Sequence, residues 1–302
     1  MSGLFDLQVN GFAGIDFQRT PGAAEVGRAC ARLNAHGVAR ILATFITDRP
    51  EALARKFAAF ETMRRDDPLI RSTIVGYHLE GPYLSTEPGY CGAHPGELMK
   101  DPDLAEFSRW QDAAGGSIRL VTLAPERRRS EEFIAALTQR GVRISLGHTN
   151  ADDRTIDAAI RAGATLCTHL GNGCPGELAR HDNIIHRLLA RDELIACLIP
   201  DGVHLPPFVL RNLFRAKPAG RVILTTDARA AAGAPPGRHT LGALEVEVGP
   251  DGVVRLPGAR NFAGSSLSLE VGVANATAWL GISPAAAREL ASDAPARALG
   301  FT

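Results

Sequence analysis

Eight short, β-rich apolar segments recur between residues 3 and 227, and most are followed by a segment with helical periodicity. We expect these strands at 3–9, 38–44, 71–80, 117–124, 142–148, 164–169, 194–199 and 221–227. Alternation of strands and helices in one chain favours a parallel sheet with right-handed crossovers. Eight such units close most naturally into a TIM-like (β/α)8 barrel, and the lack of a GxGxxG or Walker motif argues against an open doubly wound sheet.

The helical patterns between the strands carry ordinary boundary signals. They lie at 22–36, 50–65, within 101–115, 130–140, from Asn150 or Asp152 to 163, 183–192 and 206–217. Ser130 is expected to cap its helix, because a serine hydroxyl can accept a hydrogen bond from a first-turn N–H. A helix over 267–280 and a last helical stretch from Ser283-Pro284 to about Leu299 complete the chain.

Residues 229–262 interrupt this alternation. The stretches 244–248 and 253–256 alternate apolar and polar residues around a Gly-Pro-Asp-Gly turn, which predicts a β-hairpin insertion after strand eight, at about 238–257. The sequence contains no internal repeat and no low-complexity linker. We therefore expect a single α/β barrel domain over residues 1–302.

The chain is electrically balanced, with 33 basic and 33 acidic residues and a pI near 7.1. This balance argues against nucleic acid or an anionic membrane as a partner. No apolar run approaches the roughly 18–20 residues that span a bilayer, and the N-terminal segment lacks the regions of a signal peptide. Five cysteines without CxxC spacing argue against a disulfide framework. We expect a cytoplasmic protein.

Four of the expected strands end in a side chain that can bind a metal or move a proton: Glu80, His148, His169 and Asp227. The carboxyl ends of parallel strands share one rim of a barrel, where active sites of such folds are built. Glu80, His148 and His169 match the three-ligand set of a catalytic divalent-metal site. One such histidine alone is more often structural, but three ligands at equivalent strand ends argue for a shared site. Asp227 could transfer a proton from water to a leaving amine, with a helix-cap or loop aspartate as the alternative.

Three more candidates lie in loops at the same expected rim. His94 belongs to the long loop 81–100, Arg180 to the irregular loop 171–182, and His204 follows Asp201 just beyond the seventh strand. Loops of this length are often functional, and an arginine can hold an anion. For each of the three, a solvent-facing surface residue is the alternative.

Several motifs occur in order along nearly the whole chain. They are His-Leu-Glu-Gly-Pro at 78–82, Gly-His-Thr-Asn-Ala at 147–151, Thr-His-Leu-x-Asn at 168–172, Asp-Gly-Val-His at 201–204 and Thr-Asp-Ala at 226–228. Together they resemble the N-acetylglucosamine-6-phosphate deacetylases of the amidohydrolase superfamily. The resemblance implies metal-dependent hydrolysis of the N-acetyl amide of an amino sugar, most simply N-acetylglucosamine 6-phosphate, to the free amine and acetate.

The resemblance also assigns roles to individual residues. It implies that Glu80, His148 and His169 bind the metal, that Asp227 activates water, and that His94 contacts the acyl group and its developing oxyanion. The residues implied to hold the sugar and its phosphate are Ala93, His94, Asn172, Gly173, Arg180, Asp201, His204, Phe262, Ala263 and Gly264.

Many superfamily members carry His-x-His on the first strand and bind two metals, whereas this chain has Gln8-x-Asn10. We therefore expect one divalent metal per chain, Zn²⁺ first, with Fe²⁺, Mn²⁺ and Co²⁺ as alternatives that accept the same ligands. The implied partner is a small N-acetylated amino sugar, and a homodimer is compatible with the resemblance.

The sequence departs from the family in two places. We expect the small β-sandwich of the family to be absent, since the first strand begins near Met1 and the chain ends at Thr302. The segments after His169 and Arg180 also differ from the usual pattern, so amide hydrolysis is better supported than phosphate recognition. Two alternatives stay open: hydrolysis of a different N-acyl or cyclic amide, and a non-catalytic sugar-binding derivative.

Overall fold

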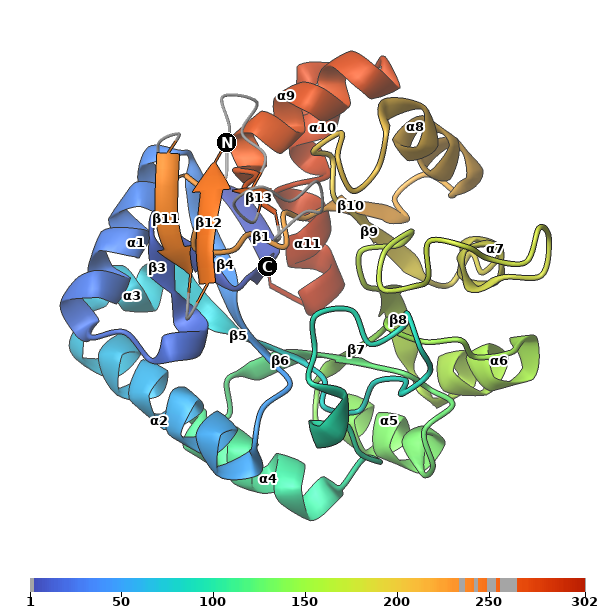
Figure 1. Ribbon diagram of the computed structural model, residues 1–302, viewed down its shortest axis with the longest axis horizontal. Coiled ribbons are helices and arrows are strands. Elements are labelled where there is room, and N and C mark those ends of the chain that lie inside the picture. The colour runs from blue at the N-terminus through green and yellow to red at the C-terminus, as the bar shows by residue number, and fades with distance from the viewer. Residues whose placement is uncertain (1–2, 234–236, 242–243, 249–253, 256–264, 302) are drawn as a thin grey trace.

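The computed structural model describes residues 3–233, 237–241, 244–248, 254–255 and 265–301. Eight parallel strands form a nearly closed barrel with helices around its outside (Figure 1). In order around the barrel they are β1 (Leu4–Val9), β4 (Val38–Ile46), β5 (Ile74–Glu80), β6 (Ile118–Leu123), β7 (Arg143–Leu146), β8 (Ala164–Cys167), β9 (Ile195–Leu198) and β10 (Val222–Leu224). This arrangement confirms the expected TIM-like (β/α)8 barrel.

The helices lie close to the expected segments. Within the described residues they are α1 (Ala23–Ala35), α2 (Pro50–Asp66), α3 (Pro68–Thr73), α4 (Leu104–Ala113), α5 (Ser130–Gln139), α6 (Asp153–Ala162), α7 (Ile184–Leu189), α8 (Pro207–Ala216), α9 (Leu269–Leu280), α10 (Pro284–Glu289) and α11 (Asp293–Leu299), with short 3-10 turns at Phe17–Arg19 and Gly96–Leu98. Asp152 is the cap of α6, since its side chain accepts from a first-turn N–H. In the described part of the chain, no helix has the length and apolarity needed to cross a membrane.

Two local predictions are wrong because neighbouring residues take the capping positions. Residues 71–73 belong to α3 rather than to a strand, since the Asp67 carboxylate accepts from two first-turn N–H groups and starts a helix there. Ser130 is not the cap of α5: Arg129 occupies that position with φ 66°. The Ser130 hydroxyl instead donates to the Ala124 carbonyl at 3.3 Å.

The last helical stretch is divided into α10 and α11, and the break has a structural use. At the break, the Leu290 carbonyl accepts from the Leu224 N–H at 2.9 Å, and the Ala291 carbonyl accepts from the Phe5 N–H at 2.8 Å. A continuous helix would keep these carbonyls for itself. The break therefore bridges β1 and β10 where the barrel closes.

The seam between β1 and β10 is held mainly by side chains. Backbone pairing there is limited to a bridge between Val9 and Ala228 among the described residues. The Asp6 carboxylate accepts from the Thr225 hydroxyl at 2.7 Å and from the Thr226 hydroxyl at 2.6 Å. Burial nevertheless raises the pKa of Asp6 to about 6. Hydrogen bonds to one buried carboxylate thus replace part of the backbone pairing between β1 and β10.

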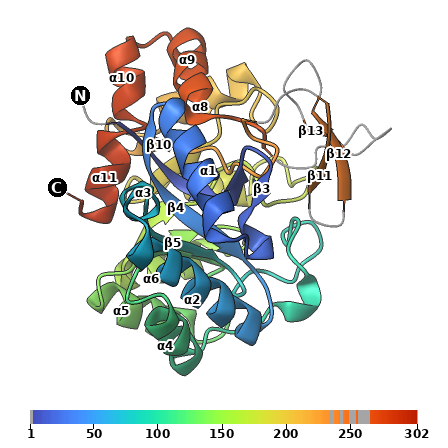
Figure 2. The same cartoon turned by 90° about the vertical axis from the view of Figure 1, so that its left-hand side faces the viewer.

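A small antiparallel sheet follows β10, made of β11 (Gly237–Leu241), β12 (Leu244–Val248) and β13 (Val254–Arg255). Pairing of β12 with β13 confirms the predicted hairpin, and β11 is a third strand that the pattern did not indicate. Figure 2 shows this sheet at the opposite end of the barrel from the two chain termini. A second short hairpin, β2 (Gly11–Phe12) with β3 (Ile15–Asp16), follows β1.

The apolar core has two parts. A large cluster lies between the strands and the helices and contains most of the aromatic side chains. A smaller cluster gathers residues from six strands, β1, β4, β6, β8, β9 and β10, together with two from α11: Phe5, Leu7, Leu42, Leu120, Leu166, Cys197, Ile223, Ala294 and Ala296. Towards the carboxyl ends of the strands, buried polar side chains take over, and these build the site.

Candidate metal centre and catalytic site

The backbone turns sharply where three of the barrel strands end. Among described residues other than glycine, six have a positive φ, and His148, His169 and Asp227 are three of them, at 52°, 31° and 49°. This left-handed region costs an ordinary residue on the order of 1 kcal/mol or more. Such strain persists where surrounding contacts impose it, and it is concentrated at functional sites.

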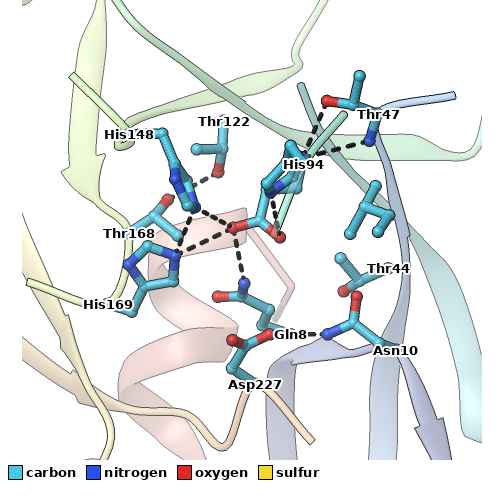
Figure 3. A network of polar contacts seen from close by, with 12 residues as sticks. Gln8, Asn10, Thr44, Thr47, His94, Thr122, His148, Thr168, His169 and Asp227 are labelled. Atoms are coloured by element: carbon cyan, nitrogen blue, oxygen red, sulfur yellow. Dashed lines mark hydrogen bonds and ion pairs between the residues drawn. The ribbon is translucent and has the colours of Figure 1, made fainter. Parts of the chain in front are cut away.

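Glu80, His148 and His169 meet at the carboxyl rim, as predicted. Their candidate ligand atoms all lie within 4.8 Å of one another, and all three side chains are buried. The two histidine Nε2 atoms are 3.1 Å apart, and Glu80 Oε1 lies 3.1 Å from Nε2 of His169 and 3.3 Å from Nε2 of His148 (Figure 3). Ligands around a tetrahedral metal with bonds of about 2.0–2.1 Å are separated by about 3.3 Å, so this spacing fits a divalent cation.

The protonation pattern supports the same interpretation. His148 Nδ1 lies 2.8 Å from the Tyr90 carbonyl, which cannot donate, so this nitrogen carries the proton and Nε2 presents a lone pair to the centre. Burial acts to raise the pKa of Glu80, yet its contacts with His148 and His169 hold it well below its usual range. The pKa of His169 is raised, since its contact with Glu80 outweighs burial. The centre therefore favours positive charge.

Two amide side chains from the end of β1 hold the two carboxylates of the rim. Gln8 Nε2 donates to Glu80 Oε1 at 3.0 Å, and Asn10 Nδ2 donates to Asp227 Oδ1 at 2.7 Å. Asp227 thus faces the centre with one oxygen fixed. Desolvation raises the pKa of Asp227, and the negative charge of Glu80 adds to the effect. From the sequence, Gln8 and Asn10 are interpreted only as replacements for metal-binding histidines. Their position at the end of the first strand is the signal that could have indicated their role as donors to the two carboxylates.

His94 reaches the centre from the long loop after β5. Its Nε2 lies 3.8 Å from Glu80 Oε2, and its side chain is buried. The Thr47 backbone N–H points at His94 Nδ1 from 3.4 Å, and the Thr47 hydroxyl lies 2.9 Å away. A backbone N–H can only donate, so Nδ1 accepts and Nε2 carries the ring proton. Burial lowers the pKa of His94 to about 3, which keeps the ring neutral. Thr47 was not identified from the sequence.

Loops at the rim bring part of the predicted sugar-binding set close to the centre. A Cβ on Gly173 would lie 3.0 Å from His148 Nδ1 and 3.1 Å from His169 Cε1, so this loop runs against the histidine rings. Asn172 Nδ2 donates to the His169 carbonyl at 3.2 Å. His204 is fixed separately, by a 2.6 Å contact between its Nδ1 and the Asp201 carboxylate.

The remaining predicted residues are not joined to this centre. Arg180 and Ala93 lie exposed on their loops, and within the described residues neither is among the hydrogen-bond or ion-pair partners of the metal cluster. Phe262, Ala263 and Gly264 fall outside the described residues. The structure thus assembles the predicted metal and proton-transfer groups and leaves the phosphate contacts open.

A parallel (β/α)8 barrel whose carboxyl rim holds a buried Glu-His-His group, with an aspartate beside it, defines a hydrolase of the amidohydrolase superfamily. The N-acetylglucosamine-6-phosphate deacetylase of Rattus norvegicus is 37% identical over 312 residues, which cover 99% of this chain and 74% of the relative. The chain belongs to the N-acetylglucosamine-6-phosphate deacetylase family. No family model matches the sequence.

Two further comparisons bear on the site. The structure of a Mycobacterium smegmatis N-acetyl-D-glucosamine-6-phosphate deacetylase mutant in complex with N-acetyl-D-glucosamine-6-phosphate superposes with a TM-score of 0.87. It is 37% identical in sequence, and the match covers 99% of this chain and 77% of that chain. An N-acetylgalactosamine-6-phosphate deacetylase of Escherichia coli O157:H7 is 37% identical over 227 residues, covering 75% of this chain and 59% of the relative.

Proposed function

We propose that this chain hydrolyses the N-acetyl amide of N-acetylglucosamine 6-phosphate and releases acetate and the free amine. The observation that carries the proposal is the buried group of Glu80, His148 and His169 with Asp227 facing it, in a member of this deacetylase family. We propose one divalent cation per chain, Zn²⁺ first, because the strand-one positions hold amide donors rather than further ligands.

Glu80, His148 and His169 would hold the cation. When bound, a divalent cation acidifies water and polarises the amide carbonyl. His148 is oriented for this task by the Tyr90 carbonyl, and Glu80 by the Gln8 amide. Such outer partners keep ligands in one orientation before the cation arrives.

Asp227 is the proposed proton carrier. Asn10 occupies Oδ1, which leaves Oδ2 to accept a proton from the attacking water. A carbon–oxygen bond then forms at the acetyl carbon, and the carbon–nitrogen bond breaks as Asp227 returns that proton to the leaving nitrogen. The raised pKa of Asp227 makes it a stronger proton acceptor than an exposed aspartate.

His94 is the proposed donor to the acetyl oxygen. Its neutral ring carries the proton on Nε2, the nitrogen that faces Glu80 and the centre. As the carbonyl carbon becomes tetrahedral, negative charge develops on its oxygen, and a preorganised neutral donor stabilises that charge without losing a proton. The low pKa of His94 suits this role better than general acid catalysis.

The rim loops are proposed to hold the rest of the substrate. Asn172, Gly173 and the pair of Asp201 and His204 would contact the sugar ring, since they border or approach the histidines of the centre. The proposed remaining contacts, to the phosphate and along the site wall, are Ala93, Arg180, Phe262, Ala263 and Gly264. Residues 1–302 are proposed to act as one barrel domain. Cytoplasmic location and a homodimer stay predictions.

The test is acetate release by the purified, zinc-loaded protein from N-acetylglucosamine and N-acetylgalactosamine, each with and without a 6-phosphate. We expect turnover of N-acetylglucosamine 6-phosphate and about one metal per chain by elemental analysis. Preference for the galactosamine epimer would show that the proposed sugar is wrong, while the proposed deacetylation would stand. No acetate from any of the four compounds, with the metal in place, would contradict the proposal.

A further inference from the structure

The inside of the barrel contains a buried polar layer that the proposed chemistry does not use. Its members lie between the smaller apolar cluster described above and the metal centre, and all are almost fully buried: Thr44, His78, Thr122, Ser145 and Thr168. The interior of such barrels is ordinarily filled by branched apolar side chains. Buried polar groups cost stability unless every partner is satisfied, so the layer calls for a physical reason.

The layer is joined by short hydrogen bonds across four neighbouring strands. His78 Nε2 on β5 lies 2.7 Å from the Thr122 hydroxyl on β6. The Thr122 hydroxyl lies 2.7 Å from that of Thr168, just beyond β8, and the Thr168 hydroxyl lies 2.6 Å from that of Ser145 on β7. Figure 3 shows Thr122 and Thr168 beside the histidines of the centre. We call this chain of four residues the hydroxyl chain.

The hydrogen bonds of the hydroxyl chain fix its members relative to one another. Thr122 has two partners in the chain, His78 Nε2 at 2.7 Å and the Thr168 hydroxyl at 2.7 Å. Thr168 likewise contacts both Thr122 and Ser145. On the other side of its ring, His78 Nδ1 lies 3.5 Å from the Thr44 hydroxyl. A hydroxyl can both donate and accept, so each hydroxyl can hydrogen-bond to two neighbours at once.

The hydroxyl chain touches the segments that carry all three metal ligands. His78 precedes Glu80 by two residues on the same face of β5, and Thr168 directly precedes His169. Ser145 lies on β7, which leads to His148. Thr122 comes from β6, which carries no ligand, and it connects β5 with the strands on its other side.

A close backbone contact tightens this connection. A Cβ on Gly147 would lie 2.9 Å from Thr122 Cγ2 and 2.9 Å from Thr168 Cβ. The residue immediately before His148 therefore packs directly on two members of the hydroxyl chain. A change in the position of Thr122 would be transmitted to His148 through this contact as well as through the hydrogen bonds.

We propose that the hydroxyl chain sets the spacing of Glu80, His148 and His169, and that Thr122 is its central positioning residue for the metal centre. The inference rests on the proposed metal-dependent function and adds a residue to it. Groups behind metal ligands typically change affinity by about 10–100-fold when removed. Thr122 acts on the cation only through the ligands, so its effect must appear in metal affinity and in the geometry of the bound metal.

The test compares Thr122→Val with Thr122→Ser and with Thr165→Val. Valine keeps the shape of threonine but lacks the hydroxyl that contacts His78 and Thr168, whereas serine keeps the hydroxyl. Thr165 is a matched control on β8, because its buried hydroxyl has no hydrogen-bond partner among the described residues. Zinc affinity is measured by chelator competition, metal-site geometry by visible absorption of the Co²⁺-substituted proteins, and folding by thermal unfolding of the metal-free proteins.

We expect Thr122→Val to bind zinc at least about tenfold more weakly and to change the Co²⁺ absorption bands. Thr122→Ser should recover most of both, and Thr165→Val should match the wild type. Equal affinity and equal Co²⁺ spectra for wild type and Thr122→Val would overturn the inference while the proposed function stands. A wild type that binds no metal would overturn both. If Thr122→Val does not fold, Ser145→Ala decides instead, with weaker zinc binding supporting the inference and unchanged binding overturning it.

Discussion

The strand ends of the barrel and the loops above them hold their predicted residues in different ways. Glu80, His148 and His169 are only 3%, 7% and 3% exposed, and each is tied by hydrogen bonds to residues on other strands or loops. Arg180, in contrast, lies exposed on an irregular loop. The rim is therefore preorganised for one kind of chemistry, whereas substrate choice depends on segments that a few substitutions can reshape.

This contrast explains why the structure supports the class of reaction more strongly than it supports the choice of substrate. Moving a strand-end ligand disturbs barrel packing, hydrogen bonds and strained turns at once. Moving an exposed loop residue such as Arg180 disturbs little beyond the loop itself. Substitutions at the rim, or of loop residues packed against it such as His94 and Gly173, should accordingly reduce turnover or metal binding for every substrate. Substitutions of exposed loop residues should change the preference among substrates. The four predictions below test this division, from the largest expected effect to the smallest.

Asp227→Asn should lower kcat by on the order of 10³-fold, because an amide cannot accept the proton of the attacking water. Zinc content should stay at the wild-type level, since Asp227 is not among the three clustered ligands. Steady-state kinetics and elemental analysis of the same preparation check both parts. Turnover within tenfold of the wild type would remove Asp227 from the proposed mechanism.

Asn10→Ala should lower kcat by about 10–100-fold with a much smaller change in KM. The Asn10 amide holds Asp227 Oδ1 at 2.7 Å, and without it the carboxylate is free to rotate away from the attacking water. Asn10→Gln is a useful companion, since the longer amide should not restore the contact. A purely structural role for Asn10 would instead lower thermal stability and leave kcat per folded molecule unchanged.

Gly173→Ala should weaken zinc binding by about tenfold, although this residue is on a loop. Its new Cβ would lie 3.0 Å from His148 Nδ1, and its φ of 62° also disfavours a side chain. Gly176→Ala is the matched control, because a Cβ there meets no atom of the described part of the chain within 4 Å. Chelator competition on both variants measures the difference. Equal zinc affinity of the two variants would show that this loop can shift to accommodate the new Cβ without displacing the metal ligands.

Arg180→Ala should raise KM for N-acetylglucosamine 6-phosphate by about tenfold and leave kcat nearly unchanged, since losing a charge-assisted contact weakens binding before reaction. The KM for unphosphorylated N-acetylglucosamine, if turned over, should not move. Kinetics on the two sugars provide the check. An equal change for both would mean that Arg180 does not contact the phosphate, and would weaken the division between rim and loops.

Much of the fold and of the centre could be predicted from local sequence. Apolar β-rich runs alternate with helical patterns over nearly the whole chain, and parallel strands place their carboxyl ends on one rim. Glu80, His148 and His169 stand at such ends, so their meeting follows from the barrel once it is expected. Ser130 shows the limit of reading residue types alone, because the adjacent Arg129 takes the capping position and the Ser130 hydroxyl donates to the Ala124 carbonyl instead.

The residues that orient the centre could not be predicted, because their partners are far away in sequence. Asn10 and Asp227 are 217 positions apart, and Gln8 and Glu80 are 72 apart. The tautomer of His94 depends on one backbone N–H of Thr47, which no motif reveals. The same holds for the hydroxyl chain, whose members look like ordinary strand residues when each is considered alone.

The sequence by itself determined the number and order of the barrel strands and which metal-binding side chains stand at their ends, since these properties depend on local periodicity and on the parallel direction of the strands. Only the tertiary structure decided which amide faces which carboxylate, which histidine nitrogen carries the proton, and how Asp6 closes the seam between β1 and β10. The physical reason is distance. Hydrogen bonds act over about 3 Å, and only the closed barrel brings these distant segments that near to one another.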